Sequence, residues 1–248
     1  MKSGTFSTAG FYRVAGPRRG RYNRTRRRGG RRPTHMPLIW LLLALPVETP
    51  PPETARATRL PQRWVDTPKG SLAGRLVCSR PRPRPPIVVY LVREGGELTH
   101  EPSPRPLVVR QKGARFDPSF AVLVAGDKAI FQNDEEQEID HNVYGLGADE
   151  FDLGIFPPGT PRQYVFTKPG EVAIHCSVHR LMDLRIFVAP SPAWAVLEGD
   201  ATAFELPEIP EGSYELRTWQ KARRFKDAAI RIRIEAGKKT TVEVGLSR

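Results

Sequence analysis

Short runs of β-branched and aromatic residues, separated by glycine and proline, dominate the chain from about residue 71 onward. Thirteen such runs predict strands, at 73–78, 86–92, 106–110, 120–125, 128–132, 161–167, 171–176, 183–189, 193–197, 202–205, 213–219, 227–234 and 239–245. Gly126-Asp127 and Pro169-Gly170 are typical of the turns between them. No segment keeps the apolar period of a helix over eleven residues. The pattern predicts an all-β protein built as a sandwich or barrel.

The runs form two groups that differ in content. Residues 71–190 contain both cysteines and four of the five histidines, whereas residues 191–248 contain neither residue type. In the second group, isoleucine alternates with alanine or arginine over 229–234, as in a strand with one dry and one wet face. We expect one domain at 71–190 and a second, small β-sandwich at 191–248 with a structural or docking role.

Charge changes the picture only at the N-terminus. The 248-residue chain has a formal net charge of +12, but residues 1–35 hold eleven of its 39 basic residues and no acidic one. The rest of the chain contains the other 28 basic residues and all 27 acidic residues, so it is close to neutral. Nucleic-acid binding is one explanation of such a segment. No reading module accompanies it and aromatic residues for base stacking are few, so we expect no nucleic-acid partner.

An apolar stretch of ten residues, 37–46, follows the basic segment. It is too short to span a bilayer, which takes about 20 residues, and suits the core of a signal peptide. Small residues at the required spacing place a cleavage site after Ala57. We expect residues 1–57 to be a basic leader and signal peptide, 58–70 to be a linker, and the rest to be periplasmic. An uncleaved membrane anchor and a translation start at Met36 are the alternatives.

The most reactive side chains gather in HCSVHRLMDL, residues 175–184. In the strand predicted for 171–176, alternation places Cys176 at the end of the dry face and His175 on the opposite face. We therefore expect His175 to lie outside any site that Cys176 forms.

Cys176, His179 and Met182 are spaced C-x2-H-x2-M in the loop before the next predicted strand. A tight loop of this kind turns a thiolate, an imidazole and a thioether toward one point, which the alternation of a strand would prevent. Such soft ligands select copper, and two histidines with one cysteine and a distant methionine form the blue-copper arrangement. The second histidine is then His141, which ends a strand-like stretch 35 residues before Cys176.

Two longer segments carry a family resemblance: FDPSFAVLVAGDKAIFQNDEEQEIDHNVYG (116–145) and FPPGTPRQYVFTKPGEVAIHCSVHRLM (156–182). Their features follow in order as a glycine turn, a hydrophobic strand ending in asparagine, a His-Asn-Val segment, a Pro-Gly turn and the Cys-x2-His-x2-Met loop. This order resembles the cupredoxins of the plastocyanin and amicyanin type, over roughly residues 70–190. The resemblance implies a Greek-key β-sandwich that holds one type-1-like copper ion.

The resemblance also implies roles for individual residues. The family's four copper ligands correspond to His141, Cys176, His179 and Met182. Asn142 corresponds to the residue that ties the ligand loops together by hydrogen bonding. Ser177, which follows the ligand cysteine, is the expected donor near the sulfur.

Two further features bear on partners. The stretch 133–140, NDEEQEID, is longer and more acidic than in the family, and its run 134–136 is expected to be a solvated loop or a docking site for a basic partner. Residues 191–248 resemble a carboxypeptidase-regulatory-like β-sandwich. The combination of the two domains is similar to bacterial proteins called methylamine-utilisation-like.

These features favour one-electron transfer between periplasmic redox proteins, such as a cytochrome or a dehydrogenase. Four protein ligands leave no open position for a substrate, so we expect no enzymatic activity. The alternative is copper binding for storage, delivery or sensing. A Cys78–Cys176 disulfide without metal is a competing explanation, but it leaves the histidine and methionine spacing to chance. A zinc site is another, although structural zinc rarely uses methionine. An adhesion-like module without metal is the third.

Overall fold

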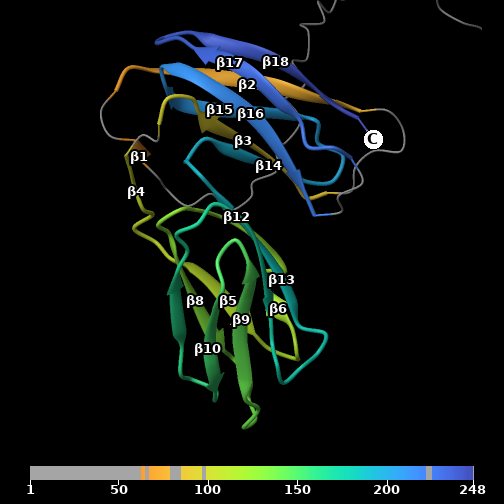
Figure 1. Cartoon of the computed structure of the whole chain (residues 1–248). Coiled ribbons are helices and arrows are strands. Elements are labelled where there is room, and N and C mark those ends of the chain that lie inside the picture. The colour runs from red at the N-terminus through yellow and green to blue at the C-terminus, as the bar shows by residue number, and fades with distance from the viewer. Residues whose placement is uncertain (1–62, 65–66, 79–84, 97–98, 222–224, 248) are drawn as a thin grey trace, which may run out of the picture. The chain divides into compact units, whose positions relative to one another are not determined.

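The computed structural model describes residues 63–64, 67–78, 85–96, 99–221 and 225–247, all within one compact unit (Figure 1). The predicted leader, 1–57, and most of the predicted linker, 58–70, lie outside these residues. The described part is all-β, as predicted, with strands β1 (Arg63–Trp64), β2 (Lys69–Cys78), β3 (Ile87–Arg93), β4 (His100–Glu101), β5 (Leu107–Gln111), β6 (Phe116–Asp117), β7 (Phe120–Val124), β8 (Lys128–Asn133), β9 (His141–Gly147), β10 (Phe151–Phe156), β11 (Arg162–Val165), β12 (Gly170–His175), β13 (Asp183–Ala189), β14 (Trp194–Leu197), β15 (Ala203–Pro210), β16 (Gly212–Gln220), β17 (Ala229–Ile234) and β18 (Lys239–Leu246). Among the described residues, no helix has the length and apolar character needed to cross a membrane.

The first sandwich is formed by two sheets, with strand orders β10-β9-β12-β13-β7 and β11-β8-β5-β6. The chain crosses between the sheets from β8 to β9 and from β11 to β12, so neighbours in a sheet come from distant parts of the sequence. Alternate residues of each strand point inward and form one core, which includes Phe131, Phe156, Phe166, Ile174 and Ile186. Cys176 and Met182, from the predicted ligand loop, are members of this core, so the core packs against that loop.

The second sandwich is formed by sheets with the orders β14-β3-β16-β17 and β15-β2-β18. It includes β2 and β3, which precede the first sandwich in the sequence, and Leu72 and Leu91 are fully buried in its core. The expected division into domains 71–190 and 191–248 needs correction here, because residues 69–93 pair with C-terminal strands. Their apolar pattern predicted strands correctly, but it carried no information about which strands they would pair with.

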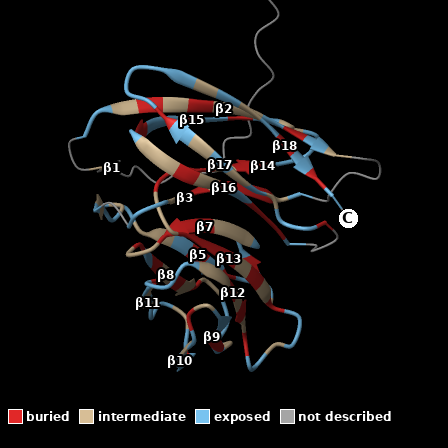
Figure 2. Ribbon diagram, turned by 45° about the horizontal axis from the view of Figure 1, so that its top comes forward, coloured by how far each residue is buried: buried red, intermediate tan, exposed pale blue. Residues whose placement is uncertain are grey.

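A third apolar cluster joins the two sandwiches. Val88 and Trp219 of the second sandwich pack with Val122, Val124 and Phe187 of the first, on strands β7 and β13 (Figure 2). Val122, Val124 and Phe187 lie on the outer face of the five-stranded sheet, which the first sandwich alone would expose to water. The second sandwich therefore covers part of the sheet that carries the metal ligands.

All thirteen predicted strands are present, but β9, β10 and the three two-residue strands β1, β4 and β6 were missed. Glycine interrupts the apolar pattern in β9 and β10. In β9, an ideal Cβ at Gly145 would lie 2.5 Å from the Phe151 ring, so only glycine allows the ring to pack there. In β10, Gly154 has a φ of 72° within a register shift between Asp152 and Ile155. The tight packing that makes this hairpin possible also removes its sequence signal.

Candidate metal centre

Strand β12 presents the cysteine to the core as alternation predicts. Ile174 is fully buried, and Cys176, on the same face just beyond the strand, is 4% exposed. His175 faces the other way, where its ring lies 5.6 Å from that of Tyr144 and its Nδ1 lies 3.8 Å from Asp183 Oδ1. The structure therefore separates the two adjacent residues, and His175 belongs to the outer surface of the sheet.

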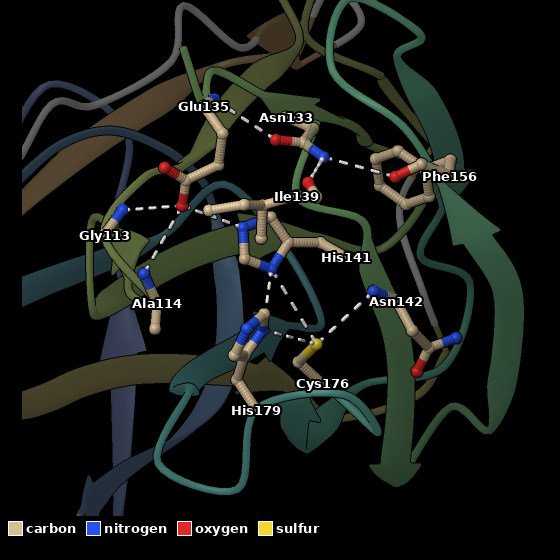
Figure 3. A network of polar contacts seen from close by, with 10 residues as sticks. All are labelled: Gly113, Ala114, Asn133, Glu135, Ile139, His141, Asn142, Phe156, Cys176 and His179. Atoms are coloured by element: carbon tan, nitrogen blue, oxygen red, sulfur yellow. Dashed lines mark hydrogen bonds and ion pairs between the residues drawn. The ribbon is translucent and has the colours of Figure 1, made fainter. Parts of the chain in front are cut away.

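Three potential metal ligands meet at the end of the first sandwich (Figure 3). His141 opens β9 and is fully buried, and its Nδ1 lies 4.0 Å from Cys176 Sγ. His179, in the loop after Cys176, places its own Nδ1 3.9 Å from the same sulfur and 3.2 Å from His141 Nδ1. Within the described residues, these three form the one group of histidine, cysteine and acidic side chains close enough to hold a metal ion.

Met182 lies at the same end of the core. Its side chain is 1% exposed and belongs to the same buried cluster as Cys176. Its backbone N–H donates to the carbonyl oxygen of His179 at 3.1 Å, which closes the tight turn between them. The loop thus brings the predicted thioether into the buried core that also includes Cys176.

Asn142 connects the two segments that carry these side chains. Its backbone N–H donates to Cys176 Sγ at 3.3 Å. Its side-chain Oδ1 accepts from the Ser177 backbone N–H at 3.2 Å, and its Nδ2 donates to Asp152 Oδ1 at 2.7 Å. The contact on the sulfur therefore comes from Asn142, while Ser177 holds the side chain of Asn142 in place.

The far side of the His141 ring contacts the acidic run. Its Nε2 lies 3.0 Å from Glu135 Oε1, and the Glu135 side chain is only 10% exposed. Burial by itself would raise the pKa of Glu135, but hydrogen bonds from His141, Ala114 and Gly113 outweigh it and lower the pKa. An ionised carboxylate can only accept, so Nε2–H of His141 is the donor in this contact, and Nδ1 is the ring nitrogen that faces Cys176.

The other two acids of the run are paired as well. Asp134 accepts from Arg110 at 2.9 Å and Glu136 from Lys112 at 2.6 Å. Sequence reasoning interpreted 134–136 as a solvated loop or a docking site for a basic partner, and it missed Glu135 as a residue of the site. In the structure the run pairs with Arg110 of β5 and with Lys112, and the Glu136 side chain stays 83% exposed, while docking of a basic partner stays a prediction. The unusual length and acidity of 133–140 were the available signal.

The disulfide alternative is wrong. Cys78 and Cys176 are both free. Cys78 ends β2 and packs against the core of the second sandwich, whereas Cys176 belongs to the core of the first. The sequence allowed the pair because the partners of β2 were unknown.

Replacing His175 with alanine tests the separation of the two adjacent residues. We expect the optical spectrum of the copper-loaded protein to keep its form, because the His175 side chain lies on the opposite face of β12 from Cys176. Absorption spectroscopy of the variant beside the unmodified protein measures this. Loss of the spectrum would mean that His175, and not His179, supplies a ligand.

The described residues thus form all-β sandwiches, and one of them brings a cysteine and two histidines together at one end. No protein-family model and no curated protein matches the chain. Among solved structures, a copper-containing nitrite reductase from Thermus scotoductus is 23% identical, with a TM-score of 0.34 over 47% of this chain and 28% of that one. A purple cupredoxin from Nitrosopumilus maritimus is 17% identical, with a TM-score of 0.31 over 34% of this chain and 99% of that one. A variant of amicyanin in its reduced Cu(I) form is 20% identical, with a TM-score of 0.30 over 34% and 81%.

Proposed function

We propose that this protein holds one type-1-like copper ion and carries single electrons between redox proteins outside the cytoplasm. The proposed ligands are His141, Cys176, His179 and Met182. The observation that carries this proposal is the convergence of two imidazole Nδ1 atoms and one cysteine sulfur in a buried site. The two Nδ1 atoms lie 3.2 Å apart, and when both present lone pairs, a cation held between them and the thiolate would remove their repulsion.

The chemistry of the donor set fits copper. A thiolate with imidazoles and a thioether suits an ion that cycles between Cu(I) and Cu(II), which is the one-electron chemistry that the bound metal would supply. Structural zinc sites rarely use methionine, so the buried Met182 argues against zinc. Asn142 donates a hydrogen bond to the Cys176 sulfur, and Glu135 contacts the His141 ring. These contacts would keep the ligands in one geometry in both oxidation states of copper.

The site favours electron transfer over catalysis. With four protein ligands, no position is left open for a substrate, unlike the metal sites of hydrolytic enzymes. His179 is partly exposed, so it offers a short path from the buried site to the surface. Beside it, Val178 is 45% exposed and Leu181 is 94% exposed. Such a small apolar surface suits a brief encounter with a cytochrome or dehydrogenase.

The test of the proposed function is an optical and electron-spin-resonance spectrum of the protein loaded with one equivalent of copper. We expect an intense visible absorption from the thiolate–copper bond and one paramagnetic copper per chain. A colourless protein that binds only Cu(I) would favour storage, delivery or sensing instead. A protein that binds no copper in either form would contradict every copper function.

Replacing Leu181 with aspartate tests the docking surface. We expect the bimolecular rate of electron exchange with a soluble c-type cytochrome to fall about tenfold, since a charge at the contact costs on the order of 1 kcal/mol of encounter free energy. Stopped-flow absorption measures the rate, and the visible spectrum of the variant should be unchanged. The control is Leu146→Asp, an equally apolar position that is 49% exposed at the opposite end of β9 from His141. Equal rates for the two variants would place the docking surface elsewhere.

A further inference from the structure

We propose that Glu135 is a fixed negative charge that sets the balance between Cu(II) and Cu(I) through His141. This inference rests on the proposed function, because it concerns the copper that the site would hold. It assigns a positioning role to Glu135, which contacts the ring of His141 but none of the other proposed copper ligands. The acidic run 134–136 and the turn after β5 then act together on the His141 ring.

One carboxylate oxygen of Glu135 receives three N–H groups. Its Oε1 lies 3.0 Å from His141 Nε2, 2.7 Å from the Gly113 nitrogen and 3.5 Å from the Ala114 nitrogen (Figure 3). Gly113 and Ala114 have φ values of 60° and 54°, in the left-handed region, which alanine seldom occupies. Consecutive N–H groups pointing into one concavity form an anion-binding nest. The turn is therefore shaped to hold a negative oxygen against the histidine.

The two acids beside Glu135 differ from it in their partners. Asp134 is paired with Arg110 and Glu136 with Lys112, and both contacts lie at the surface. Glu135 is partnered by the backbone N–H groups of Gly113 and Ala114 and by the His141 ring. Among the described residues, no lysine or arginine forms an ion pair with it, in contrast to Asp134 and Glu136. The flanking ion pairs link the run to Arg110 in β5 and to Lys112 just after it.

The consequence for the metal follows from charge and from basicity. A carboxylate that accepts a hydrogen bond from Nε2–H makes the imidazole a stronger metal ligand at Nδ1. A negative charge near the site also favours the more positive oxidation state. His141 is fully buried and the Glu135 side chain nearly so, which leaves little water to screen this charge. Both effects stabilise Cu(II) more than Cu(I) and lower the reduction potential.

The experiment compares Glu135→Gln with the unmodified protein and with Glu136→Gln. Glutamine keeps an oxygen that can accept from His141 but removes the charge, and the second variant removes an equal charge at a residue that does not touch the ring. For Glu135→Gln we expect the affinity for Cu(II) relative to Cu(I) to fall about tenfold, in line with the effect of partners behind metal ligands. The reduction potential then rises by about 59 mV. Spectroelectrochemistry measures the potential, and that of Glu136→Gln should stay near the starting value.

Three outcomes separate the proposals. An intact thiolate–copper band with the same potential in Glu135→Gln and Glu136→Gln would overturn the role of Glu135 and leave the copper site standing. Absence of the band in the unmodified protein would instead overturn the proposed function. Where Glu135→Gln does not fold, nitrogen NMR of the unmodified protein loaded with Cu(I) decides: a slowly exchanging proton on His141 Nε2 supports the hydrogen bond, and a rapidly exchanging one overturns it.

Discussion

We expect the replacement of Cys176 with serine to abolish the intense visible absorption of the copper-loaded protein and to weaken copper binding by at least about 100-fold. The cysteine sulfur lies within 4.0 Å of the Nδ1 atoms of both histidines, so it is the centre of the donor set. A serine hydroxyl does not ionise near neutral pH and lacks the soft character that selects copper. Titration with copper, followed by absorption and spin resonance, measures both changes.

The matched control is Cys78→Ser, which removes the other cysteine. Cys78 packs beside the core of the second sandwich and is free in the structure, so the spectrum and the affinity should remain as they were. Serine at 176 is close in size to cysteine, and the metal-free fold should keep its circular dichroism. Retention of the visible band in Cys176→Ser would contradict the proposed ligand set.

The second large effect concerns stability. Replacing Trp219 with alanine should lower the free energy of unfolding by about 3–5 kcal/mol. The indole is 5% exposed, stacks on Phe120 at a centroid distance of 5.7 Å and contacts Phe187 at 5.3 Å. Its Nε1–H donates to Glu171 Oε2 at 3.2 Å. The substitution removes this packing and leaves a cavity between the two sandwiches. Urea denaturation with linear extrapolation measures the loss.

Trp219→Phe provides the comparison. It keeps an aromatic ring against Phe120 and Phe187 but loses the hydrogen bond to Glu171, which is worth about 1 kcal/mol. In Trp219→Ala we also expect the single unfolding transition to separate into two, because the two cores lose their shared contact. A loss below about 1 kcal/mol in Trp219→Ala would mean that the sandwiches are stable independently of this contact.

Local sequence patterns were sufficient where a single strand or loop decides the outcome. Alternation along β12 places Cys176 toward the core and His175 away from it, because successive side chains of a strand point to opposite faces. The C-x2-H-x2-M spacing likewise places His179 and Met182 in one tight loop. These features depend on a few neighbouring residues, so the sequence itself contains them.

The partners of these elements were decided by the tertiary structure. The run 134–136 looked like a solvated loop, and only its packing against the end of β5 brings Glu135 to the His141 ring. An exposed glutamate and a buried glutamate are identical in the sequence, and only contacts between distant segments distinguish them.

By itself, the sequence determined an all-β chain, the strand that carries Cys176 and the soft donor types of the loop. The tertiary structure decided that β2 and β3 pair with the C-terminal strands, that Cys78 and Cys176 belong to different cores, and that His141 meets the loop across 35 residues. The physical reason is that strand formation follows from the side chains of one segment. Strand pairing depends on which other apolar faces in the chain are available to cover the apolar face of that strand.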